Sequence, residues 1–488
     1  MDAVAITRSP DTAQPEDGHR LTGRLGTWDI IFTVLAFNAP LTVVTNFTVL
    51  VMTMGNGLGA PITYLVAAGL LLMFAVGFTT MAKHVPNAGA YYAYITAGLG
   101  KHLGLGSALL AILCYVFLLL GIYLFTAIVW GQLFKTFFDT ELFSWWQWAL
   151  IVWALVSLFG YFRITLSAHV LSIALVGEIL VVAVWIGAVM YFKGGESLDT
   201  SWITMQNVFS GNLGIAILFA VTSYSGFEAT AVFREEARDP EQTIPRATFG
   251  AIAVMAAMFA AGSYFIINAI GPADALSVAA ADPARATVAT FGKYLGHVGL
   301  VSIEVLLCSS TFACALALHN VLSRYAYSMG MDGVFPKAFA AVHPKFGSPY
   351  KSSVRVSVVF LFLIGALTFS NADPFVGYGA FSGVGGLGLL LLLVLTSLSI
   401  VAFFLRNKDP NIKVSNWKVR YAPTISALAF AVCTWLATYN IGLMTGNVAL
   451  GIVLVAFLVA TVIGGILYAK RLEKSRPDVF AAIGRQKV

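Results

Sequence analysis

Long apolar runs recur along this chain of 488 residues and restrict the folds open to it. Hydrophobic residues make up 59% of the sequence, and charged residues make up only 11%. Most of the runs reach the ~20 residues that an α-helix needs to cross the hydrocarbon core of a bilayer. Hydrocarbon offers backbone groups no hydrogen-bond partners, so each run must pair its own backbone as a helix. The pattern excludes a soluble multidomain enzyme and predicts an all-α polytopic membrane protein.

The runs and the charges between them predict a topology of twelve transmembrane helices. The expected spans are residues 27–54, 61–82, 103–134, 146–162, 167–192, 213–233, 247–270, 298–322, 354–369, 375–405, 422–439 and 448–468. With both termini in the cytoplasm, every Lys and Arg lies in an inner segment except Lys135, Lys193, Arg285 and Lys293. Inner segments of membrane proteins carry such an excess of Lys and Arg. The net charge of +6 is therefore a signal of topology, and no nucleic-acid partner is expected.

Other motifs narrow the class further. The first 25 residues are polar, so we expect no cleaved signal peptide and a location in the plasma (inner) membrane. The four cysteines lie in apolar runs without pair spacing, and the histidines show no ligand spacing, so neither a disulfide framework nor a metal site is indicated. No nucleotide-binding or hydrolase motif occurs. We expect no enzyme activity and no cofactor.

Two of the spans are interrupted near their middle. The first contains FNAPLT at 37–42, and the sixth contains SYSGFE at 223–228. Pro40 lacks an N–H and displaces the carbonyl about one turn earlier, and Gly226 is flanked by small polar residues. The breaks lie five spans apart, so they would belong to halves of opposite orientation, as at transporter sites. Taken singly, Pro40 could be an ordinary kink and Gly226 a packing glycine.

The paired breaks predict a site for a small dipolar solute. The first break can present free backbone N–H groups and a positive helix end, which suit a carboxylate. The second break would release carbonyls, which suit an ammonium, and its bulky Tyr224 and Phe227 could wall or close a side-chain pocket. The predicted substrate-binding residues are Asn38, Ala39, Pro40, Leu41, Thr42, Ser223, Tyr224, Ser225, Gly226 and Phe227.

Two acids within apolar spans are candidates for coupling transport to an ion. An intramembrane acid is expensive to keep and is a functional-site hypothesis by default. Glu228 and Glu178 are predicted to bind protons, because a single buried carboxyl readily takes one up. Glu178 could instead coordinate Na+ with the hydroxyls of Ser309, Ser310 or Thr311 in the eighth span, which is the less favoured alternative. The structural alternatives are a hydrogen bond from loop backbone to Glu228 and one from a neighbouring helix to Glu178.

Several motifs, in order, resemble the amino acid–polyamine–organocation (APC) superfamily. SYSGFEATAVFREEARDPEQTIPRA at 223–247 is similar to its sixth-helix signature. VPNAGAYYAYI at 85–95 and HNVLSRYAYSMGMDGVFP at 319–336 resemble its third-helix entry and the end of its eighth helix. The resemblance implies a LeuT-like fold, with two inverted five-helix repeats plus two extra helices. It also implies that the first break binds a substrate carboxylate and the sixth an amino group.

The resemblance bears on the two acids and on the domains. Glu228 matches an acid linked to proton sensing and gating, whereas some proton-driven relatives carry a lysine at the position of Glu178. The implied division is an N-terminal cytoplasmic tail at 1–25, a transport core at 26–405, two further helices within 406–470 and a C-terminal cytoplasmic tail at 471–488. Within the core, the two repeats would cover about 27–192 and 213–405.

These observations predict a secondary active transporter that imports an amino acid by alternating access, with H+ as the coupling ion. A polyamine importer is the alternative within the class, because VLAFNAPLTV and YSMGMDGVFPKAFAAVHPKF also resemble putrescine importers. A diamine has no carboxylate and would require acids in the pocket, such as Glu178 and Glu228. An amino acid antiporter is a further alternative. A sensor or channel that keeps the fold without transport is a different-class alternative, disfavoured by the paired breaks.

Overall fold

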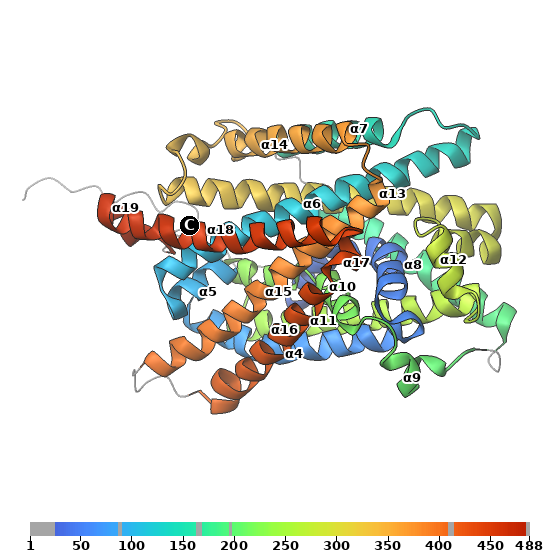
Figure 1. Cartoon of the computed structure of the whole chain (residues 1–488), viewed down its shortest axis with the longest axis horizontal. Coiled ribbons are helices and arrows are strands. Elements are labelled where there is room, and N and C mark those ends of the chain that lie inside the picture. Colours follow the sequence, from blue (N-terminus) through green and yellow to red (C-terminus); the bar gives the residue numbers. More distant parts are fainter. Residues whose placement is uncertain (1–24, 86–89, 163–167, 195–197, 408–413, 485–488) are drawn as a thin grey trace, which may run out of the picture.

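The computed structural model describes residues 25–85, 90–162, 168–194, 198–407 and 414–484 of the chain. These residues form a bundle of helices (Figure 1), so the predicted all-α class is confirmed. The helical elements are α1 (Thr27–Asn38), α2 (Pro40–Thr42), η1 (Val43–Phe47), α3 (Thr48–Leu50), η2 (Val51–Asn56), η3 (Gly57–Gly59), α4 (Ala60–His84), α5 (Ala90–Leu99), α6 (Lys101–Phe138), α7 (Trp145–Phe162), α8 (Ala168–Lys193), η5 (Ser201–Ile203), α9 (Met205–Val208), α10 (Leu213–Ser223), η6 (Phe227–Glu235), α11 (Pro240–Ile270), α12 (Ala275–Ala281), α13 (Ala286–Met331), η7 (Lys337–Ala340), α14 (Tyr350–Phe369), α15 (Pro374–Arg406), η8 (Trp417–Tyr421), α16 (Ala422–Tyr439), α17 (Ile441–Thr445), α18 (Val448–Ser475) and α19 (Pro477–Ala482).

The lengths of these helices identify a multi-pass membrane protein. In the described part of the chain, eleven helical segments are long and apolar enough to cross a membrane, and α1 is a shorter apolar helix. One of the eleven, Pro40–His84, runs through non-helical backbone at Gly55 and Gly57, so it contains parts of the first two predicted spans. The number of twelve spans and the division into a core and two extra helices stay predictions.

The links between spans also contain helices. Between α4 and α6 lies α5, and residues 86–89 before it fall outside the described part. After α11, α12 is followed by the first turns of α13, which end at a break where Gly296 has a φ of 67°.

The centre of the bundle is built on α6 and α10, the most buried of the long apolar segments. A glycine-rich face of α15 packs against both of them. A Cβ at Gly385 would lie 2.9 Å from Leu118 of α6, and a Cβ at Gly386 would collide with Thr222 of α10. Small residues let transmembrane helices approach closely, and the glycines of α15 permit such an approach here.

The periphery of the bundle is apolar on its outside. The helices α7 and α14 lie side by side at one edge of the molecule, and α18 runs along α6 (Figure 1). Large apolar side chains such as Leu180 of α8 and Leu467 of α18 are more than half exposed. A surface of this kind is matched to lipid tails. The breaks of the two interrupted helices are buried in this bundle, with Ala39 only 2% exposed and Ser223 only 1% exposed.

Candidate functional site

The first helix breaks at the predicted position. The helix α1 ends at Asn38, and Ala39 takes a left-handed conformation with φ 53° and ψ 69° before Pro40 begins α2. A proline disfavours the α-helical conformation in the residue before it, and it donates no N–H to the preceding turn. The chain then continues through the π-helical segment η1. Proline at this position therefore explains a two-part helix.

The second break lies where α10 ends at Ser223. Gly226 has a φ of 106°, and the tighter 3₁₀ helix η6 begins at Phe227. Glycine adopts this conformation without the penalty that a Cβ would add. A Cβ at Gly226 would also lie 2.6 Å from Cδ1 of Phe37, in α1. Backbone conformation and close approach of the other broken helix both require glycine here.

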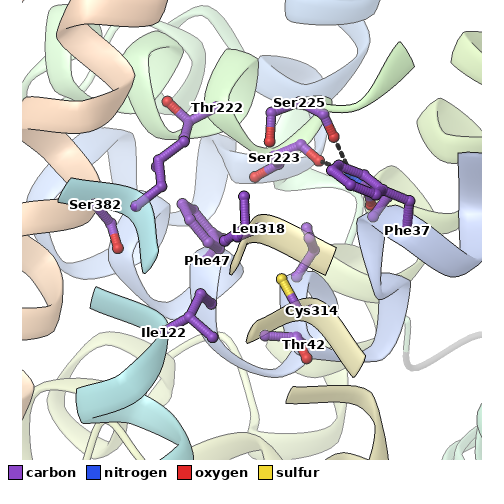
Figure 2. A pocket seen from close by; sticks show the side chains of 13 residues that line it. Phe37, Thr42, Phe47, Ile122, Thr222, Ser223, Ser225, Cys314, Leu318 and Ser382 are labelled. Carbon is purple, nitrogen blue, oxygen red and sulfur yellow. Dashed lines mark hydrogen bonds between the residues drawn. The ribbon is translucent and has the colours of Figure 1, made fainter. Parts of the chain in front are cut away.

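The side chain of Asn38 joins the two breaks. Its Nδ2 donates hydrogen bonds to the carbonyl oxygens of Ser223, at 2.7 Å, and Ser225, at 2.9 Å (Figure 2). Its Oδ1 is buried and has no hydrogen-bond partner within the part of the chain that the structure describes. The carbonyls that we predicted for a substrate ammonium are therefore released by the break, as expected, and bind a side-chain amide in this conformation.

A small cavity lies between the breaks and the central helices (Figure 2). Its volume is about 40 Å³, which is room for a few water molecules, since about 10–15 Å³ of such volume holds one. It is lined by Phe37, Asn38, Thr42, Val43, Phe47, Leu118, Ile122, Thr222, Ser223, Ser225, Cys314, Leu318 and Ser382. The lining contains hydroxyl, amide and apolar groups, and it includes no carboxylate and no basic side chain. At this volume the cavity cannot hold an amino acid in this conformation.

Glu228 binds the backbone of the second break. Its Oε2 accepts a hydrogen bond from the N–H of Gly226 at 2.9 Å, and its Oε1 accepts one from the hydroxyl of Tyr115 at 3.0 Å. The carboxyl is only 5% exposed, and it does not line the small cavity. The structural alternative, a bond to loop backbone, is therefore present. The predicted role in proton coupling stays a prediction.

Glu178 lies beside the first break. Its Oε2 accepts a hydrogen bond from the N–H of Leu41 at 3.3 Å, and the hydroxyl of Ser310 also bonds to it. A second cavity, of about 140 Å³, is lined by Glu178, Ser309, Ser310, Pro40 and others. The structure thus brings together the predicted acid, two of the three predicted hydroxyls and the break.

One of the three predicted hydroxyl residues does not line the cavity beside Glu178. Thr311 is not part of the lining of the second cavity, and its hydroxyl donates to the carbonyl of Cys308 at 3.2 Å. Thr42 Oγ1 donates to Ser310 Oγ at 3.3 Å. Among the described residues, no group of three or more His, Cys, Asp and Glu could hold a metal ion.

Tyr224 and Phe227 lie away from the small cavity. Tyr224 donates its hydroxyl to the carbonyl of Tyr64 at 2.9 Å, and Phe227 packs edge-on against Phe74 at 6.0 Å between ring centroids. Both partners are in α4. Ala39 and Pro40 line the second cavity with Glu178. Tyr224, Phe227, Ala39 and Pro40 therefore shape the backbone of the breaks. Their side chains do not line the small cavity.

Sequence reasoning missed the apolar wall of the small cavity. Phe47 comes from η1, Leu118 and Ile122 come from α6, and Leu318 comes from α13. Tyr115, the partner of Glu228, was missed as well. Each of these residues lies in a predicted membrane span, and nothing in its local sequence separates it from residues that face lipid.

The sequence model of the family described as "Amino acid permease" matches residues 39–476, which is most of the chain and includes both breaks. The chain belongs to the amino acid permease family. This family lies within the predicted APC superfamily, and the two broken helices of this all-helical permease fit the LeuT-like fold.

Curated relatives of this permease are also transporters. It is similar to the low-affinity putrescine importer PlaP of Escherichia coli (strain K12), with 24% identity over 442 residues, 88% of this chain and 91% of that protein. It is 26% identical to the branched-chain amino acid permease BcaP of Bacillus subtilis (strain 168) over 433 residues, 84% and 85% of the two chains. A methylthioribose transporter of the same organism is 27% identical over 225 residues, 45% and 44% of the two chains. The permease is therefore a transporter and not an enzyme.

Proposed function

We propose that this permease is a secondary active transporter that imports a neutral, apolar amino acid together with a proton, by alternating access. The observation that carries the proposal is the uncharged lining of the small cavity between the two breaks. A zwitterion can be held there by backbone dipoles and hydroxyl groups alone. Phe47, Leu118, Ile122 and Leu318 offer its side chain an apolar wall.

In this proposal, Asn38 occupies the place of the substrate ammonium when the site is empty. Its amide donates to the same two carbonyls, of Ser223 and Ser225, that an ammonium would bind. The cavity of about 40 Å³ is too small for an amino acid, so binding requires the amide to move and the break to widen. Substrate binding is thereby linked to a change in the relation of α1 to α10, as alternating access requires.

A polyamine importer is the second candidate, because the putrescine importer PlaP matches 88% of the chain. A diamine with two positive charges requires acidic partners, since an unpaired charge is expensive to bury. Glu178 and Glu228 lie outside the small cavity and are hydrogen-bonded to the backbone of the breaks. Because neither acid lines the small cavity, an amino acid is favoured over a diamine as the substrate.

We propose Glu228 as the main proton-coupling group. Its ionised form accepts from both Gly226 N–H and Tyr115 O–H, and protonation removes charge from an acceptor that helps to hold the second break. Proton uptake would loosen the break and ease its rearrangement. The excess of Lys and Arg in alternate links supports a plasma-membrane topology with both termini in the cytoplasm.

The transport proposal is tested with purified protein in proteoliposomes. We expect an inward-directed pH gradient to drive accumulation of leucine, unlabelled putrescine to compete weakly, and replacement of Na+ by choline to have no effect. Accumulation of putrescine without accumulation of leucine would contradict the proposal that the substrate is an amino acid. Downhill flux without accumulation would identify a channel.

Glu228→Gln tests the coupling role. It should abolish accumulation driven by the pH gradient and spare leucine counterflow, because exchange needs no net proton movement. Glu304→Gln is the matched control, since Glu304 is another buried acid, bonded to Thr136 of α6 at 3.1 Å and remote from the breaks in its contacts. Equal loss of accumulation and counterflow in Glu228→Gln would contradict coupling and leave only a structural role.

A further inference from the structure

A third cavity lies on the other side of Glu178, between α8 and α11. Its volume is about 260 Å³, larger than either cavity described above. It is lined by Pro40, Leu41, Val44, Glu178, Ile179, Val182, Ala183, Ile186, Ala257, Met258 and Ala261. Every lining residue but Glu178 has an apolar side chain. The cavity shares no lining residue with the small cavity between the breaks, so it is a separate place for a ligand.

The third cavity borders the lipid-facing surface. Ala183 of α8 and Ala257 of α11 are in its lining and are exposed. Leu180 and Val184, each 58% exposed, flank it on α8. Both helices are among the segments apolar enough to cross a membrane. A molecule dissolved in the bilayer therefore has access to this cavity without crossing water.

Glu178 gives the third cavity a chemistry that an ordinary lipid groove lacks. Glu178 also lines the second cavity, so it lies at the boundary between the two. Its carboxyl is hydrogen-bonded to Leu41 N–H and to the hydroxyl of Ser310, which are both neutral partners. A buried carboxylate gains further stabilisation when a cation pairs with it. An ammonium that arrives from the membrane would supply that charge, and the apolar walls would hold its hydrocarbon part.

The size of the third cavity limits the ligand. A cavity of about 150 Å³ lined by apolar side chains can hold benzene. The 260 Å³ available here is room for an aromatic ring with a short linker, or for an alkyl chain of comparable volume.

We propose that this third cavity binds a membrane-dissolved hydrophobic amine, with the ammonium on the carboxylate of Glu178 and the hydrocarbon part against Val182, Ile186 and Met258. Binding at this place would occupy Glu178 from the membrane side. The inference does not depend on the proposed transport function, because binding is measured directly.

The test uses the full-length protein in liposomes of neutral lipid. The probe is a decylamine that carries a photoreactive diazirine, with the corresponding decanol diazirine as the neutral match. Labelled peptides are identified by mass spectrometry. We expect the amine to label peptides from α8 and α11 around Val182 and Met258, and excess n-decylamine to reduce this labelling at least tenfold, whereas n-decanol does not.

Two variants separate charge from shape. Glu178→Gln keeps the size of the side chain and should reduce labelling by the amine at least tenfold. Ala257→Phe fills the cavity and leaves the carboxyl intact, and it should have the same effect. Leu180→Phe, on the exposed face of α8 outside the lining, is the matched control and should label as the unmodified protein does.

The outcomes decide between two occupants. Equal labelling by the amine and the alcohol, insensitive to Glu178→Gln, would mean that lipid acyl chains fill an ordinary groove, and it would overturn the proposal. If Glu178→Gln fails to fold, as judged by size-exclusion chromatography, the Ala257→Phe and decanol comparisons still decide it.

Discussion

At the scale of single residues, Gly226 meets two independent requirements. Its φ of 106° is a conformation that side chains rarely adopt, and the ring of Phe37 lies where a Cβ would be. The first requirement is local and the second comes from packing against α1. A substitution here therefore disturbs both the second break and its contact with the first.

Gly226→Ala should lower stability by about 1–2 kcal/mol or more from the backbone alone, with the contact with Phe37 adding to this. Leucine uptake by the Gly226→Ala variant should also be lower than uptake by the unmodified protein. Thermal unfolding in detergent and uptake in proteoliposomes are the measurements. Gly69→Ala in α4 is the matched control, because a Cβ there meets nothing within 4 Å. Normal uptake by Gly226→Ala would show that the site does not depend on this geometry.

Asp332 lies just after α13, outside the apolar segments, and links distant parts of the chain. Its Oδ2 accepts a hydrogen bond from the hydroxyl of Tyr92 at 3.3 Å, and that hydroxyl accepts one from the N–H of Gly484 at 2.7 Å. Burial raises the pKa of the Asp332 carboxyl, and the bond from Tyr92 opposes this in part. The C-terminal segment is therefore fixed near a carboxyl that is harder to ionise than usual.

The raised pKa of Asp332 predicts how the stability of the protein changes with pH. The folded state holds the proton more tightly than the unfolded state, whose pKa is about 3.9, so the free energy of unfolding falls as pH rises from about 4 through the folded pKa. The Asp332→Asn variant has no carboxyl to ionise at this position, so its free energy of unfolding does not fall in this way. Its melting temperature relative to the unmodified protein should be higher at pH 7 than at pH 4. A difference that is constant with pH would contradict the prediction.

At the scale of elements, the contact of α15 with α6 depends on glycine. A Cβ at Gly388 would collide with Sγ of Cys114, and a Cβ at Gly385 would lie 3.1 Å from the carbonyl oxygen of Cys114. The helix α15 also packs against α10, which ends at the second break. The spacing of α15 and α6 therefore bears on the position of that break.

Gly388→Ala should destabilise the protein by about 1–3 kcal/mol, because overpacking a tight core outweighs the ~1 kcal/mol that Ala gains over Gly in a helix. A second substitution, Cys114→Ala, removes the colliding sulfur and should restore most of the lost stability, as measured by thermal unfolding. Gly464→Ala in α18 is the control, since a Cβ there meets nothing within 4 Å. No rescue by Cys114→Ala would mean that backbone contacts set the spacing.

At the scale of the whole molecule, the two broken helices are held together around a cavity too small for an amino acid. The small cavity holds only a few waters, the amide of Asn38 bridges the two breaks, and Leu25 and Ala237 join the start of α1 to the end of η6 by a β-bridge. The two broken helices are thus tied to each other at the site and at one end. In the proposed function, substrate access therefore requires a rearrangement larger than side-chain motion.

Cys314 reports on that rearrangement, because its side chain lines the small cavity. In a variant with Cys114, Cys308 and Cys433 replaced by alanine, N-ethylmaleimide should label Cys314 slowly, since labelling waits for opening. Saturating leucine should slow the labelling several-fold by occupying the cavity. Fast labelling that leucine does not change would show that the cavity is open, and would argue against a closed resting state.

The sequence alone predicted the all-helical membrane class and the two interruptions, because hydropathy, proline and glycine act on the chain locally. The family was implied by the resemblance of several motifs. It also identified Glu178 and Glu228 as acids in apolar spans. Only the tertiary structure decided what these groups bind: Asn38 reaches carbonyls 185 and 187 positions away in the chain, and Glu228 meets Tyr115 of α6. It also decided that Glu178 faces one cavity with hydroxyls and another toward lipid. Such contacts depend on how whole helices pack, and the spacing of residues within one helix does not contain that information.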